Sequence, residues 1–180
     1  MTGSSANAFN YLIGTLIDLY VAAVLLRMLL QWVRADFYNP LSQLLIKLTN
    51  PALVPLRRVI PSVGRLDTAS VVLMLVLEFI GIWLAGKIGS HSMAWQQIIA
   101  FSAIKLLMTL LMTYFFLIIV AVILSWVGQG LRHPFIPLVF QLTEPVLRPI
   151  RKVIPPIAGI DLSPLFALIA IRFLVLLLGW

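Results

Sequence analysis

The sequence contains one motif twice, at a constant offset of 94 residues. Residues 126–161 align with residues 32–67 without a gap, and 14 of the 36 positions are identical. Four proline pairs, a threonine pair and an arginine pair all keep this offset, which unrelated segments would not do. We therefore infer a duplicated structural module, with a first repeat over residues 1–94 and a second over residues 95–180.

The composition indicates that this module folds in a membrane. The chain is 62% hydrophobic and 11% charged, with a mean hydropathy of +1.08, which is more apolar surface than a soluble domain of 180 residues can bury. The absence of cysteine excludes disulfides and thiolate metal sites. In so apolar a chain, the net charge of +7 favours membrane orientation or contact with anionic lipid over nucleic-acid binding.

Four apolar stretches are long enough to cross a bilayer, since about 20 helical residues span about 30 Å of hydrocarbon. We expect spans near residues 9–33, 67–88, 95–127 and 162–180. The third is longer than needed, so it tilts or begins in the interface. The predicted fold is all-α and polytopic: two parallel span–amphipathic segment–span repeats, related by a pseudo-twofold axis along the membrane normal.

Basic residues are concentrated in the segments that follow spans 1 and 3. These two segments face the same side of the membrane if all four spans are crossed, and they hold nine of the 13 basic residues, whereas the opposite loop has Lys87 and His91. The nine are Arg34, Lys47, Arg57, Arg58, Arg65, Arg132, Arg148, Arg151 and Lys152. Because cytoplasmic loops carry an excess of Lys and Arg, we predict that both repeated segments are cytoplasmic.

The repeated segment combines prolines with a pair of cations. After Pro40 the leucines recur at helical spacing, which predicts a short amphipathic helix in the headgroup plane. Residues 135–142 of the second copy are apolar nearly all round, which predicts deeper burial or contact with protein. The prolines that follow are expected to end one helix and open the next, giving a rigid bent element. The repeated motif positions are Thr49, Pro51, Pro55, Pro61, Asp67, Thr143, Glu144, Pro145, Pro149, Pro155 and Asp161.

The basic pairs at the distal end of each copy are candidates for binding lipid or a partner. Arg57 and Arg58 in the first copy, and Arg151 and Lys152 in the second, are placed to meet lipid phosphates or an acidic protein. The alternative is that these cations only enforce topology. The prolines that bracket them are harder to explain in that way.

Two aspartates are expected to cap helices. Asp67 and Asp161 directly precede spans 2 and 4, where a side-chain oxygen can accept hydrogen bonds from free N–H groups and meet the positive end of the helix dipole. The alternative is that they are carboxylates of an ion pathway.

Other charges fall inside the predicted spans. Glu78 and Arg172 each lie eleven residues beyond those aspartates, near mid-membrane, and we predict that they form a buried pair that locks helices together; a transport site is the alternative. Asp18, Arg27 and Lys105 are further from the centre and are expected to snorkel toward the interface.

No catalytic, cofactor or metal motif is present in the sequence. His91 and His133 are isolated from each other and from carboxylates, and the chain has no glycine-rich phosphate loop, zinc-binding helix motif or nucleophile elbow. We therefore expect a protein that is not an enzyme and has no cofactor.

The doubled pattern, Trp-Val followed by Thr-x-Pro-x-x-x-Pro-x-Arg-Arg/Lys-x-Ile-Pro and an aspartate, resembles that of the YggT family of small bacterial membrane proteins. The resemblance covers nearly the whole chain and implies a location in the bacterial inner membrane, with links to osmotic stress tolerance and potassium uptake. It also implies a Thr-Glu-Pro sequence in the motif. Thr143-Glu144-Pro145 agrees with this, whereas Asn50 replaces the glutamate in the first copy.

Two functions of different class follow from these expectations. The first is a membrane scaffold or assembly factor whose basic proline-bracketed segments contact anionic lipid or a protein partner. A second copy of the chain, in a homo-oligomer, is one such partner. The second is a small channel or transporter component for potassium or another cation, using Glu78, Arg172 and Asp18 along a pathway.

Overall fold

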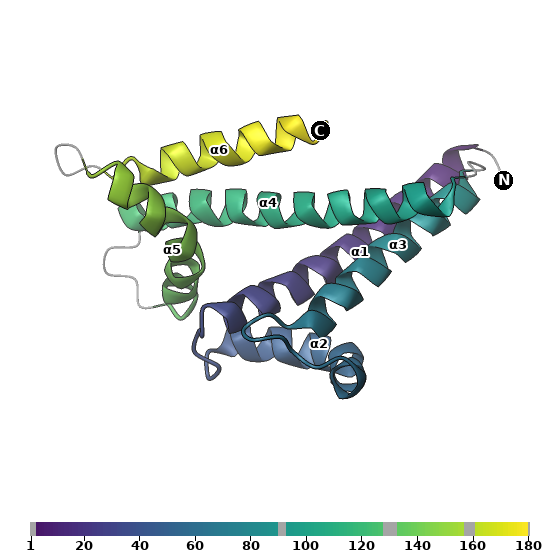
Figure 1. Ribbon diagram of the computed structural model, residues 1–180, viewed down its shortest axis with the longest axis horizontal. Coiled ribbons are helices and arrows are strands. Elements are labelled where there is room, and N and C mark those ends of the chain that lie inside the picture. Colours follow the sequence, from purple (N-terminus) through teal and green to yellow (C-terminus); the bar gives the residue numbers. More distant parts are fainter. Residues whose placement is uncertain (1–2, 90–92, 128–132, 157–160, 180) are drawn as a thin grey trace. The chain divides into compact units, whose positions relative to one another are not determined.

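The structure, a computed structural model, describes residues 3–89, 93–127, 133–156 and 161–179. Over these residues the chain is all-α, as predicted, with six helices and no β-strand (Figure 1). The helices are α1 (Gly3–Trp32), α2 (Pro40–Val59), α3 (Thr68–Ile88), α4 (Trp95–Val127), α5 (Phe135–Val153) and α6 (Ser163–Leu177). His91, Arg132 and Trp180 lie outside the described residues.

Among the described residues, three helices are long and apolar enough to cross a membrane. They correspond to α1, α3 and α4, and the bounds of these candidate spans are Ser5–Trp32, Thr68–Ile88 and Trp95–Val127. The fourth apolar helix, α6, has 15 residues and is about 22 Å long, which is less than the hydrocarbon thickness of about 30 Å. The chain is therefore a helical membrane protein, while the four-span repeat architecture stays a prediction.

The chain divides into two compact units. Unit 1 contains residues 1–28 and 45–109, and unit 2 contains residues 29–44 and 110–180. The division falls within α1, α2 and α4, so each of these helices contributes to both units. The repeat boundary at residue 94 remains a prediction.

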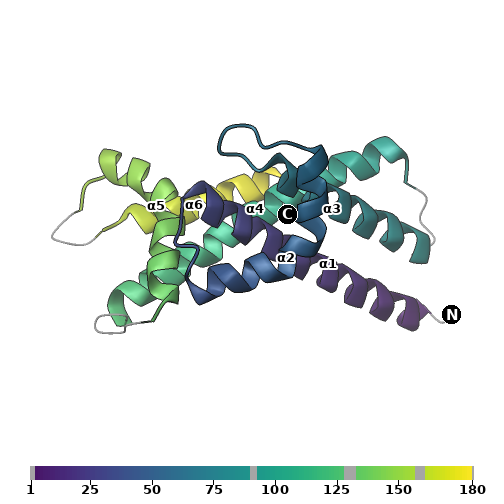
Figure 2. The same ribbon diagram turned by 90° about the horizontal axis from the view of Figure 1, so that it is seen from below.

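In unit 1, α1 and α3 run side by side in opposite directions (Figures 1 and 2). Near one end, the Asn10 side-chain amide donates a hydrogen bond to the carbonyl of Ala85. Nearer the middle, Gly81 lets α1 approach closely, because a methyl group on Gly81 would lie 3.4 Å from the Ile17 side chain. The core of the unit consists of fully buried side chains from α1, α2 and α3, namely Val21, Val24, Leu25, Leu53 and Met74.

In unit 2, α6 lies along the second part of α4 and contacts α5 (Figures 1 and 2). Its buried residues, Ser163, Ala167, Ile171 and Val175, recur every four positions and so form one stripe of the helix. The Asn39 side-chain amide donates to the carbonyl of Pro134 at 2.7 Å, which ties the start of α2 to the start of α5.

The proline-containing segments are continuous helices, which corrects the expectation that the prolines end one helix and open another. α2 continues through Pro51 and Pro55, and α5 continues through Pro145 and Pro149. Figures 1 and 2 show each helix changing direction along its length. A proline inside a helix removes one backbone hydrogen bond and bends the helix without ending it when the surrounding contacts hold both halves.

Both proline-containing helices are amphipathic. In α5 the buried side chains form one face, including Leu138, Val139 and Leu142, whereas Phe135 and Phe140 are 37% and 40% exposed. The deeper burial expected of the second copy is therefore found on one face of α5. In α2 the exposed face includes Leu44 and Leu48, whereas Ser42 is buried.

Candidate functional site

Each repeat has a turn after its proline-containing helix, closed by an arginine–aspartate ion pair. We call residues 57–67 the first elbow and residues 151–161 the second elbow; residues 157–160 are not described. In the first elbow, Arg57 Nη2 donates to Asp67 Oδ2, and the Ser70 hydroxyl donates to the same oxygen. Asp67 is 1% exposed, so this carboxylate is held almost entirely by protein groups.

The backbone of the first elbow is fixed by its own hydrogen bonds. Val63 and Leu66 exchange two N–H to carbonyl bonds of 3.1 and 3.0 Å. Gly64, between them, has a φ of 61°, a conformation that glycine adopts without steric cost. The Thr68 hydroxyl donates to the carbonyl of Pro61, so the motif proline is connected to the first turn of α3.

These contacts lower the pKa of Asp67. Burial alone would raise it, because a buried carboxylate loses its hydration, but the hydrogen bonds from Arg57 and Ser70 and the charge of Arg57 together outweigh burial. Asp67 is therefore ionised at neutral pH and is a permanent counter-ion for Arg57.

The second elbow repeats the ion pair with a different set of neighbours. Arg151 Nε donates to Asp161 Oδ2 at 3.0 Å, and Arg151 Nη1 lies 3.3 Å from the Glu144 carboxylate. The side chains of Arg151 and Asp161 are both 35% exposed, so this pair is more hydrated than the first. Both ion pairs join residues ten positions apart, and the pairs themselves are 94 residues apart.

The pKa values in the second elbow move in the directions expected for paired groups. For Asp161, burial acts to raise the pKa, but hydrogen bonds with Ser163 and the interaction with Arg151 lower it overall. For Arg151, burial acts to lower the pKa, but Asp161 and Glu144 raise it overall. Arg151 and Asp161 are therefore both charged at neutral pH.

The two aspartates differ in their relation to the helix that follows. Asp161 Oδ1 accepts a hydrogen bond of 2.9 Å from the backbone N–H of Ser163, the first residue of α6, in agreement with the predicted cap. Asp67 occupies the predicted N-cap position of α3, but the geometry there shows no side-chain cap hydrogen bond. Its carboxylate is instead occupied by Arg57 and Ser70.

The first repeat also holds a buried arginine at a position that is alanine in the second. Arg27 of α1 donates to the Thr49 hydroxyl at 2.6 Å and to the Asn50 side-chain carbonyl at 2.8 Å, and its exposed fraction is 8%. The expectation that Arg27 snorkels is therefore wrong. The equivalent position in the second repeat is Ala121, and Glu144, the equivalent of Asn50, lies beside Arg151 instead.

This difference gives a physical reason for the divergence of the motif. An asparagine next to Arg27 supplies a neutral acceptor, while a glutamate next to Arg151 supplies a counter-ion. Both residues occupy the same position of the motif, but each serves a different arginine.

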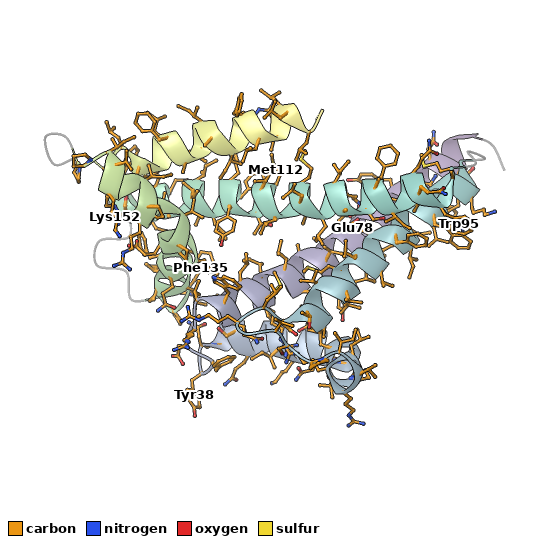
Figure 3. The ribbon with its side chains drawn as sticks, viewed as in Figure 1. Tyr38, Glu78, Trp95, Met112, Phe135 and Lys152 are labelled. Carbon is orange, nitrogen blue, oxygen red and sulfur yellow. The ribbon has the colours of Figure 1, made fainter. Side chains whose placement is uncertain are left out.

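The outermost cations of both elbows are exposed. Arg58 follows Arg57 at the end of α2, and Arg148 and Lys152 lie on the last turns of α5. Figure 3 labels Lys152 near the end of α5. The four predicted binding residues therefore separate into an inner pair, Arg57 and Arg151, held by aspartates, and an outer pair, Arg58 and Lys152, that faces away from the protein.

A second cluster of charges lies inside the spans of unit 1. Lys105 Nζ of α4 is 2.6 Å from Asp18 Oδ1 of α1 and 2.8 Å from Glu78 Oε2 of α3. Glu78, labelled in Figure 3, is fully buried, and the Asp18 side chain is 48% exposed. We call these three residues the charged triad.

The charged triad gives Glu78 a partner that sequence reasoning missed. Its counter-ion within unit 1 is Lys105, whereas the predicted pair with Arg172, which is exposed on α6 of unit 2, stays a prediction. Sequence reasoning missed this contact because it compared Glu78 with its repeat equivalent alone. The contact could have been predicted from the connection between α3 and α4, which are consecutive spans joined by a short loop. Glu78 and Lys105 lie at similar distances from that loop and therefore at similar depth in the membrane.

The described residues include one histidine, His133, and no metal-binding group. His133 Nδ1 accepts a hydrogen bond of 3.2 Å from the Phe135 N–H, a local contact at the start of α5. Within the described ranges, no group of three or more His, Cys, Asp or Glu residues could hold a metal ion.

Comparison with known proteins gives two matches to one family. A family model described as CCB3/YggT matches residues 6–88 and again residues 100–180. A Pseudomonas aeruginosa protein is 42% identical over 166 residues, covering 91% of this chain and 84% of its own. A Vibrio alginolyticus protein described as lying in the proC 3′ region is 43% identical over 176 residues, covering 96% and 94%.

A third relative is the Escherichia coli K12 protein YggT, 40% identical over 160 residues, with coverage of 88% of this chain and 82% of the relative. All three relatives are described as uncharacterized proteins. No solved structure gives a significant match to the chain.

Proposed function

This chain belongs to the CCB3/YggT family, and from that premise we propose that it is a non-enzymatic scaffold or assembly factor of the bacterial inner membrane, linked to osmotic stress tolerance. In this proposal the exposed cations of the two elbows contact the phosphates of anionic lipids. The chain crosses the membrane four times, with α6 as the last span, and both elbows lie on the cytoplasmic side, as the distribution of Lys and Arg favours.

The observation that carries the proposal is the repeated ion pair of the elbows. Arg57–Asp67 and Arg151–Asp161 each join the end of a proline-containing helix to the start of the next helix. An arginine neutralised in this way keeps the turn in shape, so the cation beside it is presented at a fixed place. Arg58 and Lys152 therefore make the contact with lipid, while Arg57 and Arg151 act as positioning residues.

The exposed face of α2 is suited to a place beside the headgroups. Leu44 and Leu48 are 61% and 51% exposed on a helix that also carries Lys47, Arg57 and Arg58. An amphipathic helix with exposed leucines and basic residues binds at the interface of an anionic membrane, where each cation near the surface contributes about 1 kcal/mol.

Native mass spectrometry of the purified protein tests this contact. The protein is incubated with phosphatidylglycerol or with phosphatidylcholine of the same acyl chains, and the bound lipid is counted. We expect phosphatidylglycerol to be retained by the native chain and lost from the variant Arg58→Gln/Lys152→Gln. Lys87→Gln, which removes a cation from the end of α3 away from the elbows, is the control and should retain the lipid.

Three outcomes count against the lipid contact. Equal retention of the two lipids would remove the anionic preference, and equal loss in the Lys87→Gln control would reduce the effect to net charge. Retention by the double variant, together with crosslinking of Arg58 or Lys152 to a protein in cells, would assign the elbows to a protein partner instead.

The charged triad favours a second candidate function, a small channel or transporter component for potassium or another cation. Ionisable groups inside spans often mark ion pathways. Under this alternative, ion flux through the reconstituted protein should disappear in Glu78→Gln. Absence of flux in the native chain under the same conditions would exclude it.

A further inference from the structure

With all three of its groups ionised, the charged triad carries one surplus negative charge. Lys105 lies within ion-pair distance of both Asp18 and Glu78, so one cation faces two carboxylates. Glu78 is fully buried and its Oε1 has no hydrogen-bond partner, whereas the Asp18 side chain is 48% exposed. The surplus is therefore accessible from outside unit 1 only on the Asp18 side of the triad.

Unit 2 carries the opposite surplus on α6. Arg172 is exposed on the outer face of this helix, together with Leu165, Ile169 and Leu176, each more than half exposed. Within the described part of the chain it has no ion pair or hydrogen bond. An isolated arginine inside a bilayer is unfavourable by at least about 2.5–3.5 kcal/mol on insertion scales.

Snorkelling does not remove this surplus readily. Arg172 is five residues from the end of α6 at Leu177 and nine from its start at Ser163. Because side chains on a helix lean toward its N-terminus, the guanidinium points away from the nearer end. It therefore remains at a depth where water is scarce and a protein carboxylate is the available partner.

The two surpluses lie at matching depth, a comparison that rests on the proposed four-span topology. Glu78 and Arg172 are each eleven residues beyond an elbow aspartate, or about 16 Å along the helix. Asp18 is 14 residues before Trp32, or about 21 Å from the same membrane surface. The reach of an arginine side chain covers that difference.

We propose that two copies of this chain associate in the membrane, with Arg172 of each copy paired with Asp18 of the other. A twofold dimer makes this contact twice, since the same surface serves both copies. Exposed apolar side chains surround both charges, Leu16 and Leu19 beside Asp18 and Ile169 and Phe173 beside Arg172. Lipid competes for such side chains, so the ion pairs supply the selectivity.

Cysteine crosslinking tests the dimer directly, because the chain has no cysteine of its own. The variant Leu19→Cys/Phe173→Cys is oxidised in membranes and run on a non-reducing gel. We expect a disulfide-linked dimer. Adding Arg172→Gln should weaken dimerisation about fivefold to thirtyfold, the range measured for polar contacts between model membrane helices.

A charge exchange separates loss of the contact from loss of folding. Asp18→Arg/Arg172→Asp reverses both surpluses, so it should restore the crosslinked dimer that Arg172→Gln loses. Each single variant is checked for a native elution volume in detergent, and the exchange variant keeps the test decisive if a single variant misfolds.

Several results would overturn the proposal. A disulfide formed within one chain, seen as loss of both thiols without a dimer band, would show that Arg172 meets the triad of its own copy. Monomeric behaviour with both thiols free would show that the triad is neutralised by a proton or a cation. The membrane topology is checked in a separate experiment, in which cysteines introduced at Ser62 and Ser90 are labelled from outside the cell. If that experiment contradicts the four-span topology, the comparison of depths fails independently of the dimer.

Discussion

At the scale of single residues, the two repeats place equivalent aspartates in different environments. Asp67 is 1% exposed and Asp161 is 35% exposed, although both accept hydrogen bonds from an arginine ten positions earlier. A buried carboxylate that loses its partner leaves an unpaired charge, whereas a hydrated one turns to water. The first elbow therefore depends more strongly on its ion pair than the second.

This difference predicts a pH dependence of stability. The folded protein holds the pKa of Asp67 below its ordinary value of about 3.9, so the ion pair stabilises the fold fully above that value, and the contribution is lost as the pH falls through the lower folded-state pKa. Asp67→Asn should reduce the free energy of unfolding at neutral pH by about 2 kcal/mol and flatten its dependence below about pH 4.

Denaturant unfolding in detergent at several pH values measures both effects. Asp161→Asn is the matched control from the second repeat, with an expected loss below about 1 kcal/mol because its ion pair is partly hydrated. Equal losses for the two variants would contradict the difference in burial.

A second prediction concerns the two motif threonines. Thr49 accepts a hydrogen bond from Arg27, while Thr143 only donates to the carbonyls of Val139 and Phe140 in its own helix. Thr49→Val leaves a buried guanidinium short of an acceptor, so we expect the free energy of unfolding to fall by about 1–3 kcal/mol. Thr143→Val should have a smaller effect in the same assay, and the reverse order would refute the anchoring of Arg27.

Sequence reasoning at this scale identified positions better than partners. The offset of 94 residues singled out Asp67, Asp161 and the basic pairs, and the predicted cap was confirmed at Asp161. It did not pair Arg57 with Asp67, because the distance between those residues depends on how the intervening turn folds. Lys105 and Arg27 were expected to snorkel, but both are bound by side chains of other helices. Sequence reasoning missed these partners because spacing along one helix does not show which other helix faces a charge.

At the scale of elements, the proline-containing helices differ most from expectation. A pair of prolines four residues apart was expected to interrupt the helix, and instead α2 and α5 continue through both. Buried side chains before and between the prolines, such as Leu53 in α2 and Leu147 in α5, pack these helices against other parts of the protein, and such contacts cannot be read from local propensity. Helix type and approximate bounds were predictable because the apolar periodicity continues through both elements.

The bend of α2 can be measured by removing its cause. Pro51→Ala/Pro55→Ala restores two N–H donors and relieves the ring clash with the preceding turn, so the helix should straighten. Spin labels at Leu44 and Arg58, both exposed, should then lie further apart by double electron–electron resonance. Labels at Leu44 and Leu48, which precede the prolines and lie only about 6 Å apart along the helix, are compared by continuous-wave line broadening as the control. A change between them would point to general unfolding.

At the scale of the whole molecule, the fold class and membrane location followed from composition. Three of the four expected spans coincide with helices of sufficient length, while α6 is shorter than its predicted span. Periodicity cannot fix the end of a uniformly apolar stretch, because no polar residue marks it. The number of crossings and their direction therefore still need a direct measurement.

Cysteine labelling determines the topology. Ser62→Cys in the first elbow should be protected from an impermeant thiol reagent added outside intact cells, and Ser90→Cys, in the opposite loop, should react with it. The chain has no other cysteine, so each signal reports one site. Labelling at Ser62 with protection at Ser90 would reverse the proposed orientation.

The length of α4 has a mechanical consequence. Its 33 residues extend about 50 Å, against a hydrocarbon layer of about 30 Å. A rod of that length fits only by leaning far from the membrane normal or by leaving the apolar layer at one end. In a thinner bilayer the excess length of α4 is larger, so the helix would lean further or extend further beyond the apolar layer.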